Sequence, residues 1–135
     1  MVGLAVLLAL DKYAPLAYTC VCKNVDAGAA MVIIETSVFT RQVQASLTDE
    51  EYRELQAALI ERPNTGPIMV GSGGLRKMRW GRPGKGKRGG LRVIYYWAVA
   101  QEQLLMLFIY PKSEQEDLTS RQLKVLRQIV EEEYP

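Results

Sequence analysis

Residues 71–97 read GSGGLRKMRWGRPGKGKRGGLRVIYYW, and the rest of the chain is best understood outward from this segment. The segment contains 8 of the 17 Lys and Arg residues and no Asp or Glu, whereas the remainder has 9 basic and 15 acidic residues. The overall net charge of +2 therefore conceals a strongly basic block in an acidic protein. Lys and Arg neutralise phosphates and release their counterions, so a basic, glycine-rich segment between strand-like runs is suited to bind a polyanion. The alternative is a loop whose charges are simply solvated.

A short strand is predicted at Leu75–Trp80, before the glycine-rich turn. Successive side chains of a strand point to opposite faces, so Met78 and Trp80 face one way. Lys77 and Arg79 then face the other way, which places the basic pair on one face of the predicted sheet.

Two long apolar runs, Leu91–Val99 and Leu104–Tyr110, come after the turn. A few polar residues separate them, which predicts a β-hairpin of central strands. Arg92 is expected to lie across from the basic pair of the preceding strand. Tyr95 and Trp97 are two residues apart in this strand, so their side chains point to the same face, and we expect both in the core.

Cations and tyrosines on a sheet face are typical of single-stranded RNA binding, because the cations grip a phosphate and the rings stack on an exposed base. The tyrosines near the predicted basic face are Tyr95, Tyr96 and Tyr110.

The flanking sequence supplies further strands and two helices. Residues 31–36, MVIIET, predict a first strand, and residues 68–70 predict a short strand ahead of the basic block. Capping boxes at Thr48 and Thr119, each followed three residues later by Glu or Gln, predict two helix starts. The order strand, helix, four strands, helix predicts an α+β domain. We expect a compact antiparallel sheet of four or five strands packed against two or three helices on one face.

The composition restricts the class of protein and its chemistry. A chain of 135 residues with 48% hydrophobic residues suits one domain, and no run approaches the ~20 apolar residues of a membrane span. Because the chain has no His, Cys20 and Cys22 lack the further ligands of a zinc site, and we expect no metal and no cofactor. Catalysis must then use Lys, Arg, Tyr, Ser, Asp or Glu.

Residues 1–30 differ in pattern from the rest of the chain, and we expect the domain to comprise residues 31–135. Val2–Leu10 superficially resembles the core of a signal peptide, but no Lys or Arg precedes it and charged residues end it early. We interpret residues 1–30 as a loosely attached extension or as sequence upstream of the native start, which we predict at Met31.

Phosphate-loop patterns also occur in the basic block. Gly84, Gly86 and Gly89 satisfy G-x-G-x-x-G, but such a loop requires a helix N-terminus directly after it to supply amides and a dipole. A strand is predicted there instead, which argues against a nucleotide-binding loop.

Four blocks of residues resemble a known family. They are Gly73–Arg79, Gly84–Gly90, Arg92–Tyr96, and Ile109-Tyr110 with Lys112–Thr119. On these blocks, the chain from Met31 onward resembles the HigB-type branch of the RelE/ParE toxin superfamily. The resemblance implies the compact RelE-like α+β fold.

The resemblance also implies the toxin of a type II toxin–antitoxin module. RelE and HigB members cleave messenger RNA in the A site of the 30S ribosomal subunit, without a metal or cofactor, and so inhibit translation. The implied protein is cytoplasmic, with no membrane partner. Its implied partners are the ribosome, messenger RNA and a cognate helix-turn-helix antitoxin of the HigA type. It would contact operator DNA only through this antitoxin.

The implied chemistry is attack of a ribose 2′-hydroxyl on the adjacent phosphate. Carried over residue by residue, Lys77 and Arg79 fall on the paired basic positions of the strand, with Lys77 or Arg79 near the attacking hydroxyl, and Arg92 falls on the arginine that stabilises the phosphate. Lys112 falls on another basic site position, whereas Ser113 stands where an arginine is expected. A guanidinium stays protonated and is a poor base, which makes Lys77 the better candidate for proton transfer. A site with so few acid and base groups depends on orientation by the ribosome, so we expect little cutting of naked RNA.

Further residues are expected to bind RNA or the ribosome without taking part in catalysis. They are Arg76, Arg82, Lys85, Lys87, Arg88 and Tyr110. Two other functions fit parts of the sequence. A ParE-like gyrase inhibitor shares the fold but has no nuclease site, and a noncatalytic RNA- or DNA-binding module would explain the charge equally well.

Overall fold

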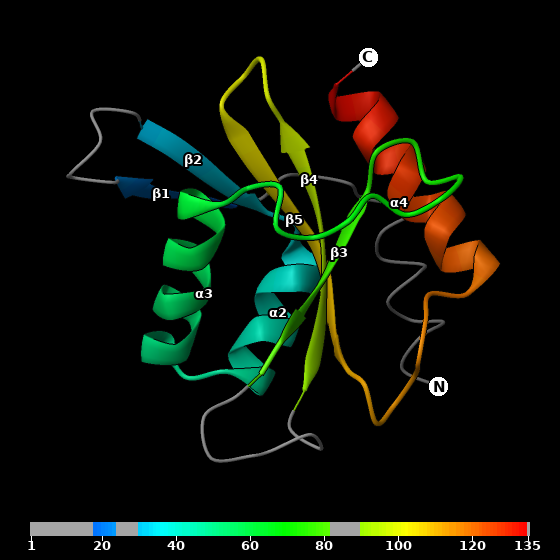
Figure 1. The fold of residues 1–135 in the computed structure, drawn as a ribbon, viewed down its shortest axis with the longest axis horizontal. Helices are drawn as coiled ribbons and strands as arrows, with labels where there is room; N and C mark the ends of the chain where they lie inside the picture. Colours follow the sequence, from blue (N-terminus) through cyan, green and yellow to red (C-terminus); the bar gives the residue numbers. More distant parts are fainter. Residues whose placement is uncertain (1–17, 24–29, 82–89, 135) are drawn as a thin grey trace.

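A computed structural model of the protein describes residues 18–23, 30–81 and 90–134 (Figure 1). In chain order its elements are β1 (Tyr18–Lys23), β2 (Ala30–Glu35), α2 (Ser37–Ser46), α3 (Asp49–Glu61), β3 (Arg76–Trp80), β4 (Leu91–Ala98), β5 (Gln103–Pro111) and α4 (Ser120–Glu133).

The strands form one five-stranded sheet in the order β1-β2-β5-β4-β3. The β4–β5 hairpin and the β3–β4 pair are antiparallel, as predicted, but β2 pairs with β5 in parallel. The sheet is therefore mixed, because the chain leaves β2 through two helices and two strands before β5 returns beside it in the same direction. The predicted α+β class is confirmed, and the five strands and three helices of the described residues fall within the predicted numbers.

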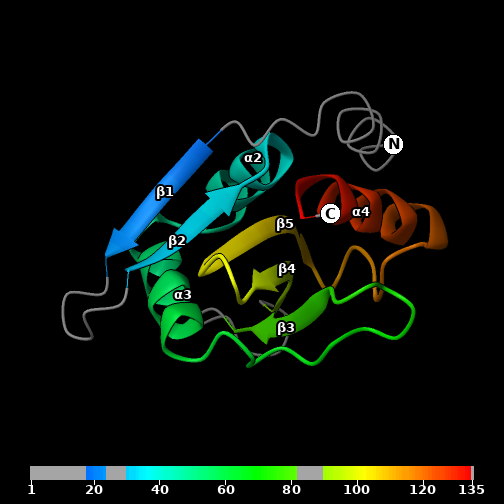
Figure 2. The ribbon, with the colours of Figure 1, turned by 90° about the horizontal axis from the view of Figure 1, so that it is seen from above.

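The helices cover both faces of the sheet, so the prediction of helices on one face was wrong. Figure 2 shows β5, β4 and β3 following one another between α3 and α4. Central strands β4 and β5 are buried along most of their length, at residues that face either side of the sheet. A strand that is apolar on both faces needs a covering layer on each.

Each face has its own apolar cluster. The first joins Leu55 and Leu59 of α3 to Met78 and Tyr95 of the sheet. The second joins α4 to the opposite face of the sheet, and its members include Ile94, Phe108, Leu126, Ile129 and Val130. Helix α2 contributes to both, with Phe39 in the first cluster and Val38 in the second.

Both predicted capping boxes are present. The Thr48 hydroxyl accepts from the Glu51 N–H at 3.1 Å, and the Glu51 carboxylate accepts from the Thr48 N–H at 2.9 Å. The same reciprocal pair joins Thr119 and Gln122 at the start of α4, at 3.1 and 3.0 Å. These bonds satisfy N–H groups that have no partner within the helix, and they fix where α3 and α4 begin.

Two local predictions were wrong. Helix α2 was not predicted, and residues 68–70 do not form a strand, since only an isolated bridge joins Ile68 to Arg76. Val70 is 97% exposed, and the chain turns directly after it at Gly71, Gly73 and Gly74, all with positive φ. Such backbone angles favour glycine and end the extended segment.

Strand β1 pairs antiparallel with β2, and the other residues before Ala30 lie outside the described part. The predicted domain boundary at residue 30 stays a prediction. None of the helices in the described ranges is long and apolar enough to cross a membrane.

Tyr95 links the sheet to the loop after α3 and generates a stability prediction. Its hydroxyl donates to the Pro63 carbonyl oxygen at 2.7 Å and accepts from the Gly66 N–H at 2.9 Å. Tyr95→Phe leaves the buried Gly66 N–H without this partner, so we expect the free energy of unfolding to fall by about 1–3 kcal/mol. Urea denaturation measures the change, and an unchanged midpoint would contradict the role assigned to this hydroxyl.

Candidate active site

Strand register brings the predicted site residues together. Arg79 of β3 is the Cα partner of Arg92 of β4, and Arg92 is in turn the partner of Tyr110 of β5. Directly opposed residues share a face of the sheet, so these three side chains form a row across three strands. Lys77, two residues from Arg79, lies on the same face. We call these four residues the cationic row: the three cations Lys77, Arg79 and Arg92, with the neutral Tyr110 beside Arg92. The cationic row lies on the face of the sheet that α4 covers.

The cationic row is partly buried. Arg92 is only 6% exposed, whereas Arg79 is exposed and the Lys77 side chain is 28% exposed. Within the described ranges, no carboxylate forms an ion pair with Arg79 or Arg92. Like charges directly opposed across strands are destabilising, and a buried charge loses its hydration. The two opposed positive charges destabilise the folded state by repulsion and make this face of the sheet suited to an anion.

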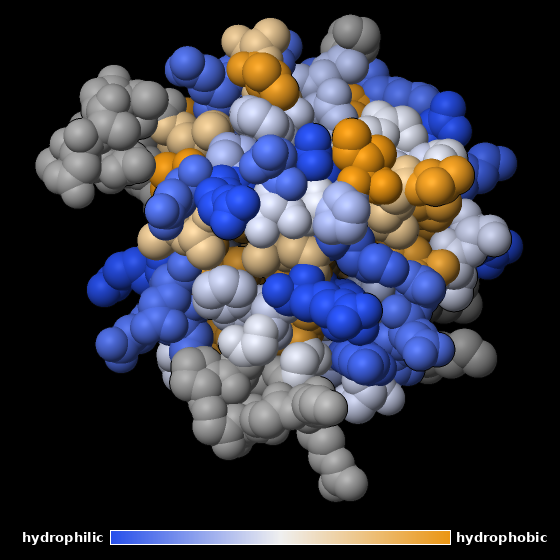
Figure 3. Space-filling model, viewed as in Figure 1, coloured by the Kyte–Doolittle hydropathy of each residue, from blue (hydrophilic) through white to orange (hydrophobic). Residues whose placement is uncertain are grey.

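Figure 3, in the view of Figure 1, shows strongly hydrophilic residues gathered over the middle of this side of the molecule, where β3 runs. Apolar residues are visible there as small separate groups. The surface in this view is thus mostly polar.

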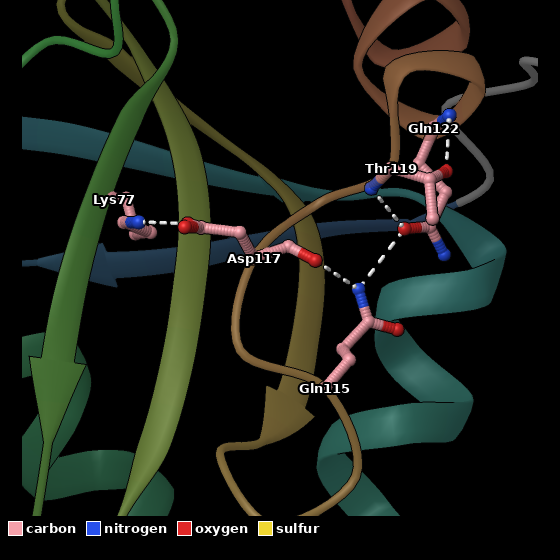
Figure 4. A network of polar contacts seen from close by, with 5 residues as sticks. All are labelled: Lys77, Gln115, Asp117, Thr119 and Gln122. Carbon is pink, nitrogen blue, oxygen red and sulfur yellow. Dashed lines mark hydrogen bonds and ion pairs between the residues drawn. The ribbon is translucent and has the colours of Figure 1, made fainter.

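Asp117 is the carboxylate of the site, and sequence reasoning did not assign it a role. Its side chain accepts a hydrogen bond from the Lys77 ammonium, with which it also forms an ion pair (Figure 4). This hydrogen bond, the charge of Lys77 and the more distant charge of Arg92 lower the pKa of Asp117. Asp117 is therefore ionised at neutral pH.

The start of α4 holds Asp117 in place. Gln115 donates to the Asp117 backbone oxygen at 2.9 Å and to the Gln122 side-chain oxygen at 3.0 Å (Figure 4). The same oxygen of Gln122 accepts from the Thr119 N–H in the capping box. The cap that begins α4 thus also fixes the loop that carries Asp117 to Lys77.

Tyr110 lies across from Arg92 in the sheet, and its ring and hydroxyl are both buried. The residue is 3% exposed, and its ring packs against Phe108 with centroids 5.7 Å apart. Burial, with the nearby charge of Asp117, raises the pKa of Tyr110 to about 12 although Arg92 opposes the shift. The hydroxyl is buried and has no hydrogen-bond partner in the described structure.

The expectation that tyrosines of this sheet stack on a base is wrong for Tyr95 and Tyr110, because neither ring is exposed. Tyr95 and Tyr110 are buried in the two apolar clusters. Tyr96 stacks on Tyr134, with centroids 5.4 Å apart. The core position predicted for Tyr95 is confirmed, whereas Trp97 is partly buried and packs against the same cluster.

Lys112 lies at the edge of the site. It follows the last residue of β5, and its N–H donates to the Gly90 carbonyl oxygen at 3.1 Å, which fixes it beside the start of β4. Its side chain is exposed. Lys112 thus sits two residues beyond Tyr110, at the same end of the hairpin as Arg92.

The predicted docking residues are only partly described. Arg76 lies on the opposite face from Lys77, where its guanidinium donates to the Gly66 carbonyl oxygen at 2.8 Å and sits 5.8 Å from the centre of the Trp97 ring. It clamps the loop after α3 to the sheet. The remaining four predicted docking residues fall outside the described residues: Arg82, Lys85, Lys87 and Arg88.

The ligand that this site can hold is determined by its donors. Guanidinium, ammonium and hydroxyl groups match the oxygens of a phosphate, and arginine does so with fixed geometry. No group of three His, Cys, Asp or Glu side chains is arranged to hold a metal ion in the described part of the chain.

The site thus lies in a small α+β domain that carries Lys77, Arg79 and Arg92 on one face of its sheet. Residues 31–134, from β2 through α4, match the family described as the RelE toxin of the RelE / RelB toxin-antitoxin system. The protein belongs to the RelE toxin family. The predicted superfamily is confirmed at this level, and the HigB-type branch stays a prediction.

The Lys77–Asp117 pair predicts a specific titration. We expect the Asp117 carboxyl to titrate below 3.8, and Lys77→Met to move the midpoint up toward that value, because Lys77 is the largest cause of the lowered pKa. The pair stabilises the folded protein above the unfolded-state pKa, and this contribution is lost as pH falls through the folded-state pKa. Carbon-detected NMR measures the midpoint, with Lys124→Met, at an exposed position of α4, as the matched control. Equal midpoints in the wild type and Lys77→Met would contradict the pairing.

Proposed function

We propose that this protein is a HigB-type toxin that cleaves messenger RNA in the A site of the 30S ribosomal subunit and thereby inhibits translation. The observation that carries the proposal is the opposition of Arg79 and the buried Arg92 beside Lys77 on one face of the sheet. Membership of the RelE toxin family supports the same activity.

The partners we propose are those that this activity requires. They are the ribosome, messenger RNA and a cognate HigA-like helix-turn-helix antitoxin, which neutralises the toxin and connects it to operator DNA. The proposed place of action is the cytoplasm, where translated messenger RNA is found.

In the proposed reaction the 2′-hydroxyl of one nucleotide attacks the adjacent phosphorus. A bond forms between the 2′-oxygen and phosphorus, and the bond from phosphorus to the 5′-oxygen of the next nucleotide breaks. The products are a cyclic phosphate and a free 5′-hydroxyl. The enzyme must move a proton from the 2′-hydroxyl, supply one to the 5′-oxygen and stabilise the negative charge that develops on phosphorus oxygens.

The residues of the site divide these tasks. Arg79 and Arg92 stabilise the developing charge, because guanidinium groups present fixed donors to phosphate oxygens. Lys77 transfers the protons: its neutral amine takes the proton of the 2′-hydroxyl, and the ammonium so formed supplies a proton to the 5′-oxygen. Lys112 adds an exposed cation at the edge.

The ribosome supplies what this small site lacks. Orienting the 2′-oxygen in line with the bond that breaks contributes a large part of the rate in such reactions. The proposed docking residues are Arg82, Lys85, Lys87 and Arg88, which would bind RNA phosphates through charge.

The proposal is tested by Arg92→Ala. Loss of a group that stabilises transition-state charge reduces the rate by about 100-fold to 1,000-fold. The assay compares cleavage of messenger RNA on purified ribosomes with cleavage of the same RNA alone, and primer extension locates the cuts. The matched control is Arg53→Ala, which removes an exposed arginine from α3 on the other side of the sheet. Antitoxin binding shows that Arg92→Ala is folded.

Each outcome has a clear meaning. Cuts within translated frames that require the ribosome, and that Arg92→Ala abolishes while Arg53→Ala preserves them, support the proposal. Inhibition of gyrase without RNA cleavage would indicate the ParE-like function instead. Binding of RNA or DNA without cleavage would indicate a noncatalytic module, and equal cleavage by Arg92→Ala would mean that the site is elsewhere.

A further inference from the structure

The hydroxyl of Tyr110 has no explanation in the fold. In the described part of the structure, the buried side-chain polar atoms without a hydrogen-bond partner are this oxygen and Nε1 of Trp80. A buried hydroxyl that makes no hydrogen bond destabilises the folded state, because it has lost its bonds to water. Such groups are uncommon in native proteins and often indicate a functional role.

Packing alone would be served better by phenylalanine. The ring of Tyr110 belongs to the apolar cluster under α4 and contacts Phe108. A phenyl ring would keep these contacts and remove the unsatisfied oxygen. The hydroxyl therefore lacks a partner among the described residues and is available to a ligand.

The surroundings of the hydroxyl indicate an anionic partner. Tyr110 is the cross-strand neighbour of Arg92, which is buried and opposed by Arg79 on its other side. An anion bound by these two arginines would lie on the same face as Tyr110, which is the β5 member of the cationic row. With its pKa raised to about 12, the phenol remains protonated in the neutral range, so it acts as a donor and not as a base.

We propose that the Tyr110 hydroxyl donates a hydrogen bond to a non-bridging oxygen of the scissile phosphate while Arg92 binds the same group. The proposal rests on the function proposed above and makes Tyr110 a catalytic residue that touches the substrate. It replaces ring stacking with hydrogen bonding as the role of this tyrosine. It also explains why an unsatisfied hydroxyl is retained in the core.

The test compares two Tyr→Phe variants of neighbouring strands. Tyr110→Phe removes a hydroxyl without a partner, whereas Tyr95→Phe removes one that makes two hydrogen bonds on the other face. Three quantities are measured for each variant. They are the free energy of unfolding in urea, the rate of ribosome-dependent cleavage, and the affinity for a fluorescent 2′-O-methyl RNA hexanucleotide, which cannot be cleaved.

The two variants should behave in opposite ways. We expect Tyr110→Phe to be at least as stable as the wild type, to cleave about 10-fold to 100-fold more slowly and to bind the hexanucleotide about 5-fold more weakly. Tyr95→Phe should be less stable, with unchanged cleavage and affinity at temperatures where it is folded. A merely structural role for Tyr110 would lower its stability and leave the folded protein fully active.

The results also separate this proposal from the proposed function. If the wild type cleaves RNA and Tyr110→Phe cleaves and binds equally well, the hydrogen bond is refuted and the nuclease function stands. If the wild type binds the hexanucleotide but cleaves nothing, weaker binding by Tyr110→Phe still supports the phosphate contact. If the wild type does neither, both proposals are refuted.

Discussion

The register of three neighbouring strands is the constraint on which the site depends. It aligns Arg79, Arg92 and Tyr110 across β3, β4 and β5. A slip of one residue would turn every side chain of a strand to the other face and would send the charge of Arg92 into the apolar cluster under α3. The irregularity beside Ile94 lies further along the hairpin, where Leu107 is the extra residue of β5, so it leaves this row intact.

The face of the sheet under α4 carries both the opposed charges of the site and apolar contacts that stabilise the fold. Arg92 and the Tyr110 hydroxyl are buried within a layer that Ile94, Phe108 and the apolar side of α4 complete. Burial of apolar side chains supplies stability that offsets the opposed charges. Helix α4 has a second task, because its capping box fixes the loop that carries Asp117. The start of α4 therefore also positions Asp117 beside Lys77.

The sequence predicted what local patterns determine. Alternation placed Lys77 and Arg79 on one face, and capping boxes located α3 and α4. Helix α2 was not predicted, because its sequence SVFTRQVQAS has several β-branched residues of low helix propensity and no acidic residue in the first turn. Packing of Phe39 in the core stabilises this helix. The parallel β2–β5 pair, the burial of Tyr110 and the contact of Asp117 with Lys77 join residues far apart in the chain, and no local pattern specifies them.

The central claim is that the cationic row binds the phosphate at which RNA is cut. The most direct measurement is a structure of the ribosome with this protein and a messenger RNA that carries a 2′-O-methyl group in the A site. The account predicts that the phosphate after the methylated ribose contacts Arg92 and the Tyr110 hydroxyl, with Lys77 released from Asp117 beside the 2′-oxygen. A phosphate bound on the α3 face, or a cationic row that contacts only ribosomal RNA, would contradict it.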